Sequence, residues 1–244
     1  MQKARIFKIG VGGRMPAIKP RTFGWPMEKR ARKREQYVTI TCTTNKATIH
    51  IVNMDSNPAN TYLVTPNVPT RVLLKERNID NLWQFLYKQT NVTAIDLSEM
   101  NLRKCYSFAE LFSGATNLTK IIFPKYRINQ TSWRSAFDGL SNLETLDLSM
   151  FDFGMYKNTP SSMIKFDRTW AGCRKLKSIK FGYNAMANID FSDSPLDEES
   201  VLSVINGLAK VTSQTVKFKK ESYNTLTIEE IAMATSKGWT IASV

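Results

Sequence analysis

Two periods of apolar residues follow one another along the middle of this chain. One pattern returns three times within residues 111–182, as LFSGATNLTKIIFP, AFDGLSNLETLDLS and TWAGCRKLKSIKFG. In each copy apolar residues first recur at intervals of three and four, and then alternate with polar residues. Intervals of three and four are typical of a helix, and alternation is typical of a strand with one buried face. The pattern therefore predicts a series of short helices, each followed by a short strand.

The three copies align on the leucines Leu118, Leu143 and Leu176. Each copy has an aromatic residue six positions earlier, a glycine four positions earlier, and apolar residues three and five positions later. These slots hold Phe112, Phe137 and Trp170; Gly114, Gly139 and Gly172; Ile121, Leu146 and Ile179; and Phe123, Leu148 and Phe181. The glycines predict a positive φ where each helix ends, and the apolar slots predict a core shared between neighbouring copies.

Two less regular copies flank these three. The earlier one has Lys88 at the glycine slot, and the later one is degenerate. Their slots hold Leu86, Val92, Ile95 and Leu97 in the first, and Ile205, Gly207, Val211, Val216 and Phe218 in the last. From the first copy onward, successive copies are 26, 25 and 33 residues apart. Periods of about 20–50 residues are typical of solenoids, so we expect the copies to stack.

The copies resemble the BspA-type leucine-rich repeats of bacterial surface proteins. The strings FSGATNLTKIIF, FDGLSNLETLDLSMFDFG and WAGCRKLKSIKF carry the resemblance, which covers residues 80–244. It implies an α/β leucine-rich-repeat solenoid of short parallel strands and short helices. The ending TIEEIAMATSKGWTI also looks like the tails of repeat proteins encoded by gut bacteria and their phages. Two departures are the long interval before the last regular copy and the lack of a secretory signal in the first residues, because the family is usually secreted.

The flanking regions predict different structures. Residues 35–79 contain four strand-like runs separated by turn residues, which predict a small antiparallel β unit that either caps the repeats of residues 80–194 or stands beside them. Residues 195–244 predict a C-terminal cap of helix, strand, helix and strand. Within this cap, Thr227 and Glu230 predict a capping box at the start of the second helix, which Gly238 ends.

Charge is concentrated at the beginning of the chain. The net charge is +13, and residues 1–34 hold eleven Lys and Arg against one Glu, which leaves +3 for the rest. Gly and Pro are frequent there, so we expect an extended basic arm that becomes ordered on a partner. The candidate partner-binding residues of the arm are Arg14, Lys19, Arg21, Lys29, Arg30, Arg32, Lys33 and Arg34. A solubilising tail is the alternative interpretation.

The second candidate surface is the outward face of the predicted strands. Side chains between the inward apolar residues project from this face, and solenoids commonly bind protein partners there. The candidate residues are Asp96, Lys120, Ile122, Thr145, Asp147, Ser178 and Lys180. Plain solvation of these side chains is the alternative interpretation.

Catalytic chemistry finds no support in the sequence. His50 is the only histidine, and it lies in a predicted strand without a recognisable Ser–His–Asp or Cys–His arrangement. The cysteines Cys42, Cys105 and Cys173 have no CxxC spacing, and Cys173 occupies a core slot. Gly10-Val11-Gly12-Gly13 lacks the rest of a phosphate loop. We therefore predict a non-enzymatic protein with no catalytic residues, no cofactor, no metal and no membrane span.

These observations lead to one functional hypothesis and two alternatives. We expect a structural protein of a bacteriophage virion, associated with the capsid, portal or tail, anchored by the arm in an oligomeric assembly, with the repeats as a displayed or protein-binding surface. The first alternative is a surface adhesion module on a bacterial cell, as in the secreted relatives. The second is a protein that binds nucleic acid non-specifically through the arm, where few aromatic residues are available for base stacking.

Overall fold

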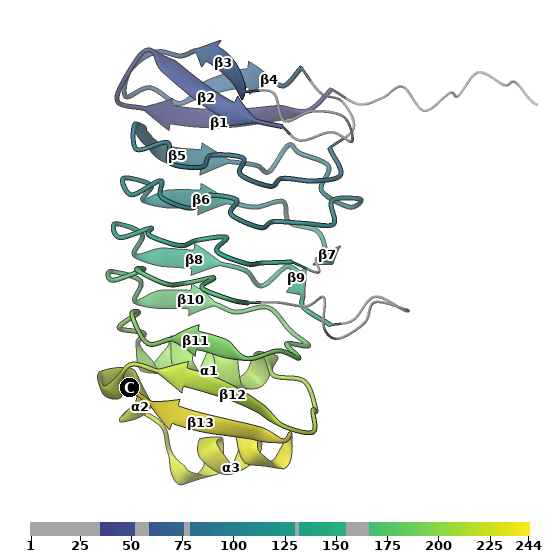
Figure 1. Ribbon diagram of the computed structural model, residues 1–244, viewed down its shortest axis with the longest axis vertical. Coiled ribbons are helices and arrows are strands. Elements are labelled where there is room, and N and C mark those ends of the chain that lie inside the picture. The colour runs from purple at the N-terminus through teal and green to yellow at the C-terminus, as the bar shows by residue number, and fades with distance from the viewer. Residues whose placement is uncertain (1–34, 52–58, 76–78, 130–131, 155–165) are drawn as a thin grey trace, which may run out of the picture. The chain divides into compact units, whose positions relative to one another are not determined.

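Short strands make up most of the regular structure, and a few helices gather near the C-terminus (Figure 1). The computed structural model describes residues 35–51, 59–75, 79–129, 132–154 and 166–244, all within one compact unit of residues 33–244. The predicted mixed α/β class is confirmed. Within the described residues no sheet closes into a barrel. The predicted arm of residues 1–34 lies outside the described residues.

The four strands predicted within residues 35–79 are confirmed. They are β1 Tyr37–Cys42, β2 Lys46–His50, β3 Ala59–Leu63 and β4 Thr70–Leu73. Strand β1 pairs antiparallel with β4, and β2 pairs antiparallel with β3. The other edge of β1 pairs antiparallel with β5, Val92–Asp96, the first strand of the repeats. Hydrogen bonds of one sheet therefore join this region to the repeats.

Four segments of the chain share one backbone course. They are residues 82–97, 108–123, 133–148 and 166–181, called here the repeated segments, and their strands are β5, β6 Lys120–Ile122, β8 Thr145–Asp147 and β10 Ser178–Lys180. Strands β5 and β6 pair in parallel, as do β8 and β10, and β6 contacts β8. Figure 1 shows the four strands one above another. Two further short strands, β7 Ile128–Asn129 and β9 Phe151–Asp152, also pair in parallel.

The helices predicted within the repeated segments are wrong. The residues before each strand form successive turns in which two residues, four positions apart, have a positive φ. These pairs are Gln84 and Lys88, Glu110 and Gly114, Ser135 and Gly139, and Arg168 and Gly172. A helix does not continue through a left-handed residue. The part of each repeated segment before its strand therefore forms tight turns and not a helix. The glycine prediction is confirmed, and Lys88 adopts the same conformation at φ 56°.

Backbone groups in these turns bond between segments instead of along a helix. Three N–H groups of each of the first three segments donate to carbonyls of the next, at 2.7–3.2 Å. The bonds are Gln84 to Ala109, Leu86 to Leu111, Lys88 to Ser113, Glu110 to Arg134, Phe112 to Ala136, Gly114 to Asp138, Ser135 to Asp167, Phe137 to Thr169, and Gly139 to Ala171. Buried backbone groups need partners, and here the neighbouring segment supplies them.

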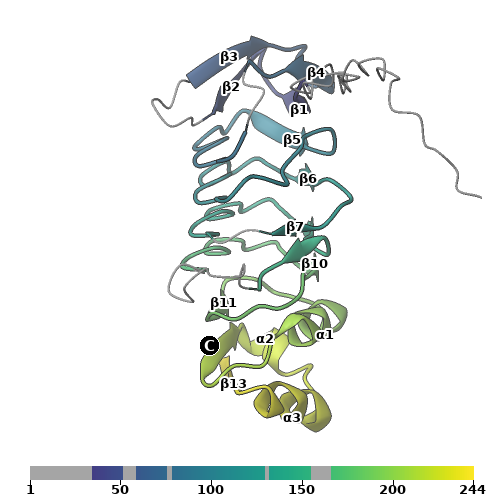
Figure 2. The same cartoon turned by 90° about the vertical axis from the view of Figure 1, so that its right-hand side faces the viewer.

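The C-terminal elements predicted within residues 195–244 are confirmed. They are α1 Glu198–Gly207, β12 Gln214–Phe218, α3 Ile228–Ser236 and β13 Trp239–Ser243, with a short α2, Lys220–Tyr223, before α3. Thr227 and Glu230 form the capping box, and Gly238 has a φ of 86° after α3. Strands β11 Ile189–Phe191, β12 and β13 form a parallel sheet in that order. Figure 2 shows α1 and α3 on the same side of this sheet.

The degenerate fifth copy is not formed. Val216 and Phe218 lie in β12, which pairs with β11 and β13 and not with β10. Helix α1 lies against β10 instead. The interval between Gly207 and Val216 is too long for the turn seen in the regular copies, and the chain uses it to enter the last sheet.

One apolar core runs through all the described parts. The aromatic slots Phe112, Phe137 and Trp170 are fully buried, as predicted, and so is Cys173. Aromatic rings of successive segments lie in contact: the centroids of Phe112 and Phe137 are 6.1 Å apart. Ring–ring contacts add to the stabilisation that comes from buried apolar area. Because these contacts join neighbouring segments, the core stabilises the stack of segments more than it stabilises any one segment alone.

Candidate interaction surface

The predicted strand-face residues lie on four neighbouring strands. Asp96 is on β5, Lys120 and Ile122 on β6, Thr145 and Asp147 on β8, and Ser178 and Lys180 on β10. Thr145 lies opposite Ser178, and Asp147 lies opposite Lys180. All seven side chains are exposed or half-buried, and the residues between them are buried. Pro124 and Gly182, which follow Ile122 and Lys180 by two positions and continue the alternation, are buried and do not belong to this surface.

The two aspartates of this surface also hold the chain where their strands end. The Oδ1 atom of Asp96 accepts the N–H of Ser98 at 2.8 Å. The Oδ1 atom of Asp147 accepts both the N–H of Ser149 at 3.0 Å and its hydroxyl at 2.6 Å. Asp side chains commonly stabilise turns in this way. Their presence in the repeated pattern therefore has a structural reason that does not require a partner.

The remaining side chains of the surface are two lysines, two hydroxyl-bearing residues and one isoleucine. Lys120 and Lys180 are exposed, and Ile122 is half-buried beside Asp96 on the neighbouring strand. Thr145 and Ser178, the first residues of β8 and β10, carry short hydroxyl side chains. A surface that mixes hydroxyl groups, two amines and an apolar side chain fits contact with another protein.

Sequence reasoning missed the continuation of this surface onto the antiparallel strands. Thr39 on β1 lies opposite both Asp96 on β5 and Arg71 on β4. The guanidinium of Arg71 lies 3.4 Å from the ring centroid of Tyr37 and forms two hydrogen bonds with Glu99, at 2.8 and 2.6 Å. Because the register of antiparallel strands depends on their turns, no spacing in the sequence pointed to this group.

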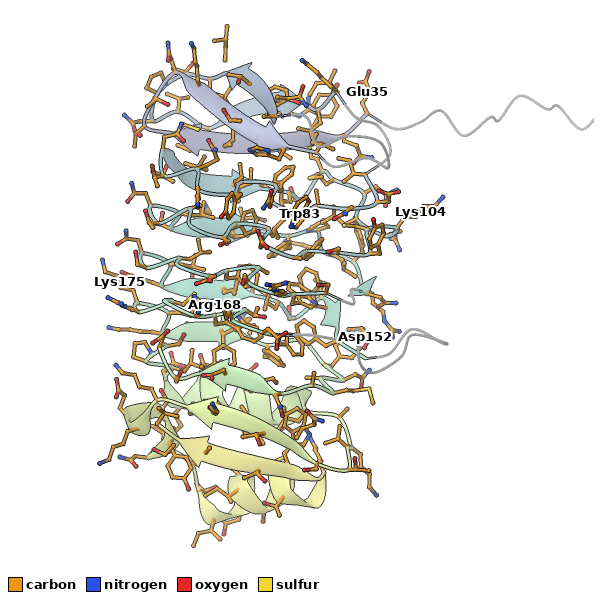
Figure 3. The ribbon with its side chains drawn as sticks, viewed as in Figure 1. Glu35, Trp83, Lys104, Asp152, Arg168 and Lys175 are labelled. Carbon is orange, nitrogen blue, oxygen red and sulfur yellow. The ribbon has the colours of Figure 1, made fainter. Side chains whose placement is uncertain are left out.

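A second polar cluster lies around Asp152 on β9. Its carboxylate is almost fully buried, forms an ion pair with Arg127, and accepts hydrogen bonds from the side chain of Asn184 at 2.9 Å and the N–H of Gly154 at 3.0 Å. Burial opposes ionisation of Asp152, but these donors outweigh it and hold the pKa of the carboxyl below its usual value. Figure 3 shows Asp152 and Lys104 on the side of the strands away from Lys175.

The buried thiols and the remaining acidic groups show no arrangement suited to catalysis or metal binding among the described residues. Burial raises the pKa of the Cys105 and Cys173 thiols to about 12, so both stay protonated near neutral pH and are poor nucleophiles. Within the part of the chain that the structure describes, no three His, Cys, Asp or Glu side chains gather as metal ligands would. A surface hollow near β11 and β12 is lined by Asp190 and Lys217, which form an ion pair with each other at 3.4 Å.

The arm residues Arg14, Lys19, Arg21, Lys29, Arg30, Arg32, Lys33 and Arg34 lie outside the described residues. The strand face is therefore the predicted surface that the structure describes. In comparisons with family models, curated proteins and solved structures, no match to this chain was found. Among the described residues, no helix has the length and apolar character needed to cross a bilayer.

Proposed function

We propose that the chain is a leucine-rich-repeat solenoid of BspA type that acts as a non-enzymatic structural and interaction protein in a bacteriophage virion. The observation that carries the proposal is the backbone course that the four repeated segments share. Their left-handed pairs recur at the same positions in all four, and the hydrogen bonds to the next segment recur in the first three. Each of these three segments obtains buried bonds from the next, as expected of a protein built from stacked repeats.

The form of the strand face supports an interaction role. Its outward side chains are mixed in charge, and the chemically notable groups elsewhere are paired, protonated or buried. Repeat proteins use such extended surfaces for protein partners. The protein is expected to bind through many weak contacts over several strands and not through one deep pocket.

The virion context rests on the sequence. A basic arm with eleven Lys and Arg among residues 1–34 is suited to the gaps between acidic subunits of an assembly, or to packaged nucleic acid. The resemblance of the C-terminal tail to phage-encoded repeat proteins points in the same direction. The arm would anchor the chain, and the repeats would be displayed or would bridge neighbouring subunits.

Particle incorporation tests this proposal. Particles are produced in cells that supply either the full chain or a version lacking residues 1–34, then purified and analysed by quantitative mass spectrometry. The full chain is expected at a fixed copy number for each particle, and the shortened chain is expected to be absent. Normal incorporation of the shortened chain contradicts the anchoring role, and absence of the full chain from purified particles contradicts the virion assignment.

The strand face is tested in the same assay with two double variants. Lys120→Glu with Lys180→Glu reverses both amines of the face. Lys104→Glu with Lys125→Glu makes the same change in charge at two exposed lysines of the turns. If the strand face contacts a virion protein, only the first variant reduces incorporation or particle stability. Equal behaviour of the two variants argues for a displayed, unoccupied face.

The charge of the arm also favours the nucleic-acid alternative, which a separate measurement distinguishes. Binding of a random DNA duplex is measured over a range of salt concentrations with and without residues 1–34. Phosphate contacts release counterions, so binding through the arm gives a steep loss of affinity with salt. A steep dependence that disappears with the arm, together with absence from particles, favours the alternative.

A further inference from the structure

A surface hollow lies where the fourth repeated segment meets the last sheet. Its volume is about 400 Å³, within the range of about 300–1,000 Å³ that is common for the sites of small ligands. The first turn of the fourth segment lines one side, and strands β11 and β12 line the other. Two buried apolar residues, Phe166 and Ile189, contribute to the lining together with several polar side chains. Apolar lining with a few convergent polar groups is typical of a ligand site.

One backbone donor at this hollow lacks the acceptor that its equivalents have. In the first three repeated segments this N–H group donates to an amide carbonyl of the next segment, as that of Ser135 does to Asp167 at 2.9 Å. Arg168 occupies the same position in the fourth segment, and its N–H has no acceptor among the described residues. Four residues later, the N–H of Gly172 donates to the carboxylate of Asp193 at 2.7 Å. The row of donors is therefore satisfied at Gly172 and open at Arg168.

Three side-chain groups in the lining are also available to a ligand. In the part of the chain that the structure describes, no partner is found for the carboxylate of Asp167, the hydroxyl of Thr215 or the side-chain nitrogen of Asn188. The Oδ1 atom of Asn188 accepts the N–H of Thr215 at 2.8 Å, which holds this amide in place. The hollow thus offers one acceptor, one donor and one hydroxyl that can serve as either.

The charges around the hollow cancel. The lining contains the carboxylates of Asp167 and Asp190 and the cations of Arg168 and Lys217. Lys217 forms an ion pair with Asp190 at 3.4 Å, and Arg168 forms one with Asp138 at 3.0 Å. An anionic ligand would share the hollow with two carboxylates, and a cationic ligand would share it with two cations. Because like charges brought together oppose binding, the lining fits an uncharged ligand.

We propose that this hollow binds a neutral sugar ring that carries an acetamido group. The acetamido carbonyl accepts the N–H of Arg168, in place of the amide carbonyl that a further segment would supply. The acetamido N–H and the ring hydroxyls supply partners for Asp167, Asn188 and Thr215, and the C–H groups of the ring contact the apolar lining. This inference concerns a different surface from the strand face, and it does not rest on the proposed function.

Related sugars test the assignment on the full chain by saturation-transfer NMR. N-acetylglucosamine and N-acetylgalactosamine carry the acetamido group, whereas glucose and galactose carry a hydroxyl at the same carbon. At least one acetamido sugar is expected to bind with a dissociation constant on the order of 1 mM, as suits a ligand of this size. Its hydroxyl counterpart is expected to bind about five- to tenfold more weakly, because the amide carbonyl and N–H are both missing. Glucosamine, which has an ammonium group there, is expected not to bind.

Two variants with the same chemical change locate the binding in the hollow. Asp167→Ala removes a carboxylate that has no partner, so the fold keeps its hydrogen bonds, and the affinity for the acetamido sugar is expected to fall about tenfold. Glu144→Ala removes an exposed carboxylate just before β8 and is expected to bind as wild type does. Equal melting temperatures show that both variants are folded. No saturation transfer to either acetamido sugar, equal binding of the hydroxyl counterpart, or unchanged affinity in Asp167→Ala overturns the proposal.

Discussion

The hydroxyl of Ser200 on α1 accepts the backbone N–H of Ile179 on β10, at 2.8 Å. One turn later, the hydroxyl of Ser203 accepts the N–H of Phe181 at 2.9 Å. In the first and third segments the residue in the slot of Phe181 donates to the next strand, Leu97 to Ile122 and Leu148 to Lys180. Side chains of a helix thus take the place of the carbonyls that a further segment would have supplied.

This relationship predicts the cost of removing either hydroxyl. Ser200→Ala leaves the buried N–H of Ile179 without its partner, and an unsatisfied buried donor costs about 1–3 kcal/mol. We expect a loss of that size for Ser200→Ala, a smaller loss for the less buried Ser203→Ala, and almost none for the exposed Ser213→Ala. Urea unfolding followed by circular dichroism measures all three. An unchanged midpoint for Ser200→Ala would mean that water or a shift of α1 satisfies the strand.

The glycine slots are tested by two substitutions, one that replaces a glycine and one that introduces it. Gly139 has a φ of 78°, and a Cβ atom there would lie 3.7 Å from the Cα of Gly114, an ordinary contact. Gly139→Ala therefore tests conformation alone, and the left-handed region costs about 1–2 kcal/mol for a residue with a Cβ. We expect that loss in the free energy of unfolding.

Lys88 occupies the same slot and already bears this conformational cost. Lys88→Gly relieves it but adds flexibility to the unfolded chain. We expect the two effects to offset one another, with a net change within about 0.5 kcal/mol. A large loss in Lys88→Gly, comparable to that of Gly139→Ala, would show that side-chain contacts and not the left-handed backbone decide this slot.

Asp152 predicts how stability depends on pH. A carboxyl whose pKa in the folded state lies below its unfolded value of about 3.9 stabilises the fold above that value. The contribution is lost as the pH falls through the folded pKa. We expect Asp152→Asn to be less stable than wild type by about 1–3 kcal/mol at pH 7, with a difference that shrinks below about pH 4.

Denaturant unfolding between pH 3 and pH 7 measures this difference, with the exposed Glu144→Gln as the control. The control is expected to follow wild type throughout. A constant gap between Asp152→Asn and wild type over the whole range would mean that the loss comes from packing and not from the charge.

The same substitution at two buried tryptophans is expected to lower the free energy of unfolding by different amounts. The Nε1 atom of Trp239 donates to the carbonyl of Ala209 at 2.8 Å. The Nε1 atom of Trp133 is buried and has no hydrogen-bond partner among the described residues. Trp239→Phe removes a bond, whereas Trp133→Phe removes an unsatisfied donor and a similar volume. We expect Trp239→Phe to lose about 1 kcal/mol more, measured by unfolding followed by far-ultraviolet circular dichroism. An equal or larger loss in Trp133→Phe would contradict this.

The sequence determined the strands, the buried slots and the glycines of the repeated segments. Alternation of apolar and polar residues requires one buried face, and a glycine at the same slot in the three regular copies indicates a backbone that most other residues avoid. The same local information located the outward residues Lys120 and Lys180 and the capping box of α3. These features depend on residues that are close together in the chain, so the sequence is sufficient to predict them.

Only the tertiary structure decided how backbone groups are satisfied across the chain. Intervals of three and four indicated helices, but the left-handed residues Glu110, Ser135 and Arg168 divide the segments into turns whose N–H groups bond to the next segment. The sequence likewise did not predict the position of α1 against β10 or the register that places Thr39 beside Asp96. Each depends on partners far away in sequence, because a buried donor takes whichever acceptor the folded neighbour presents.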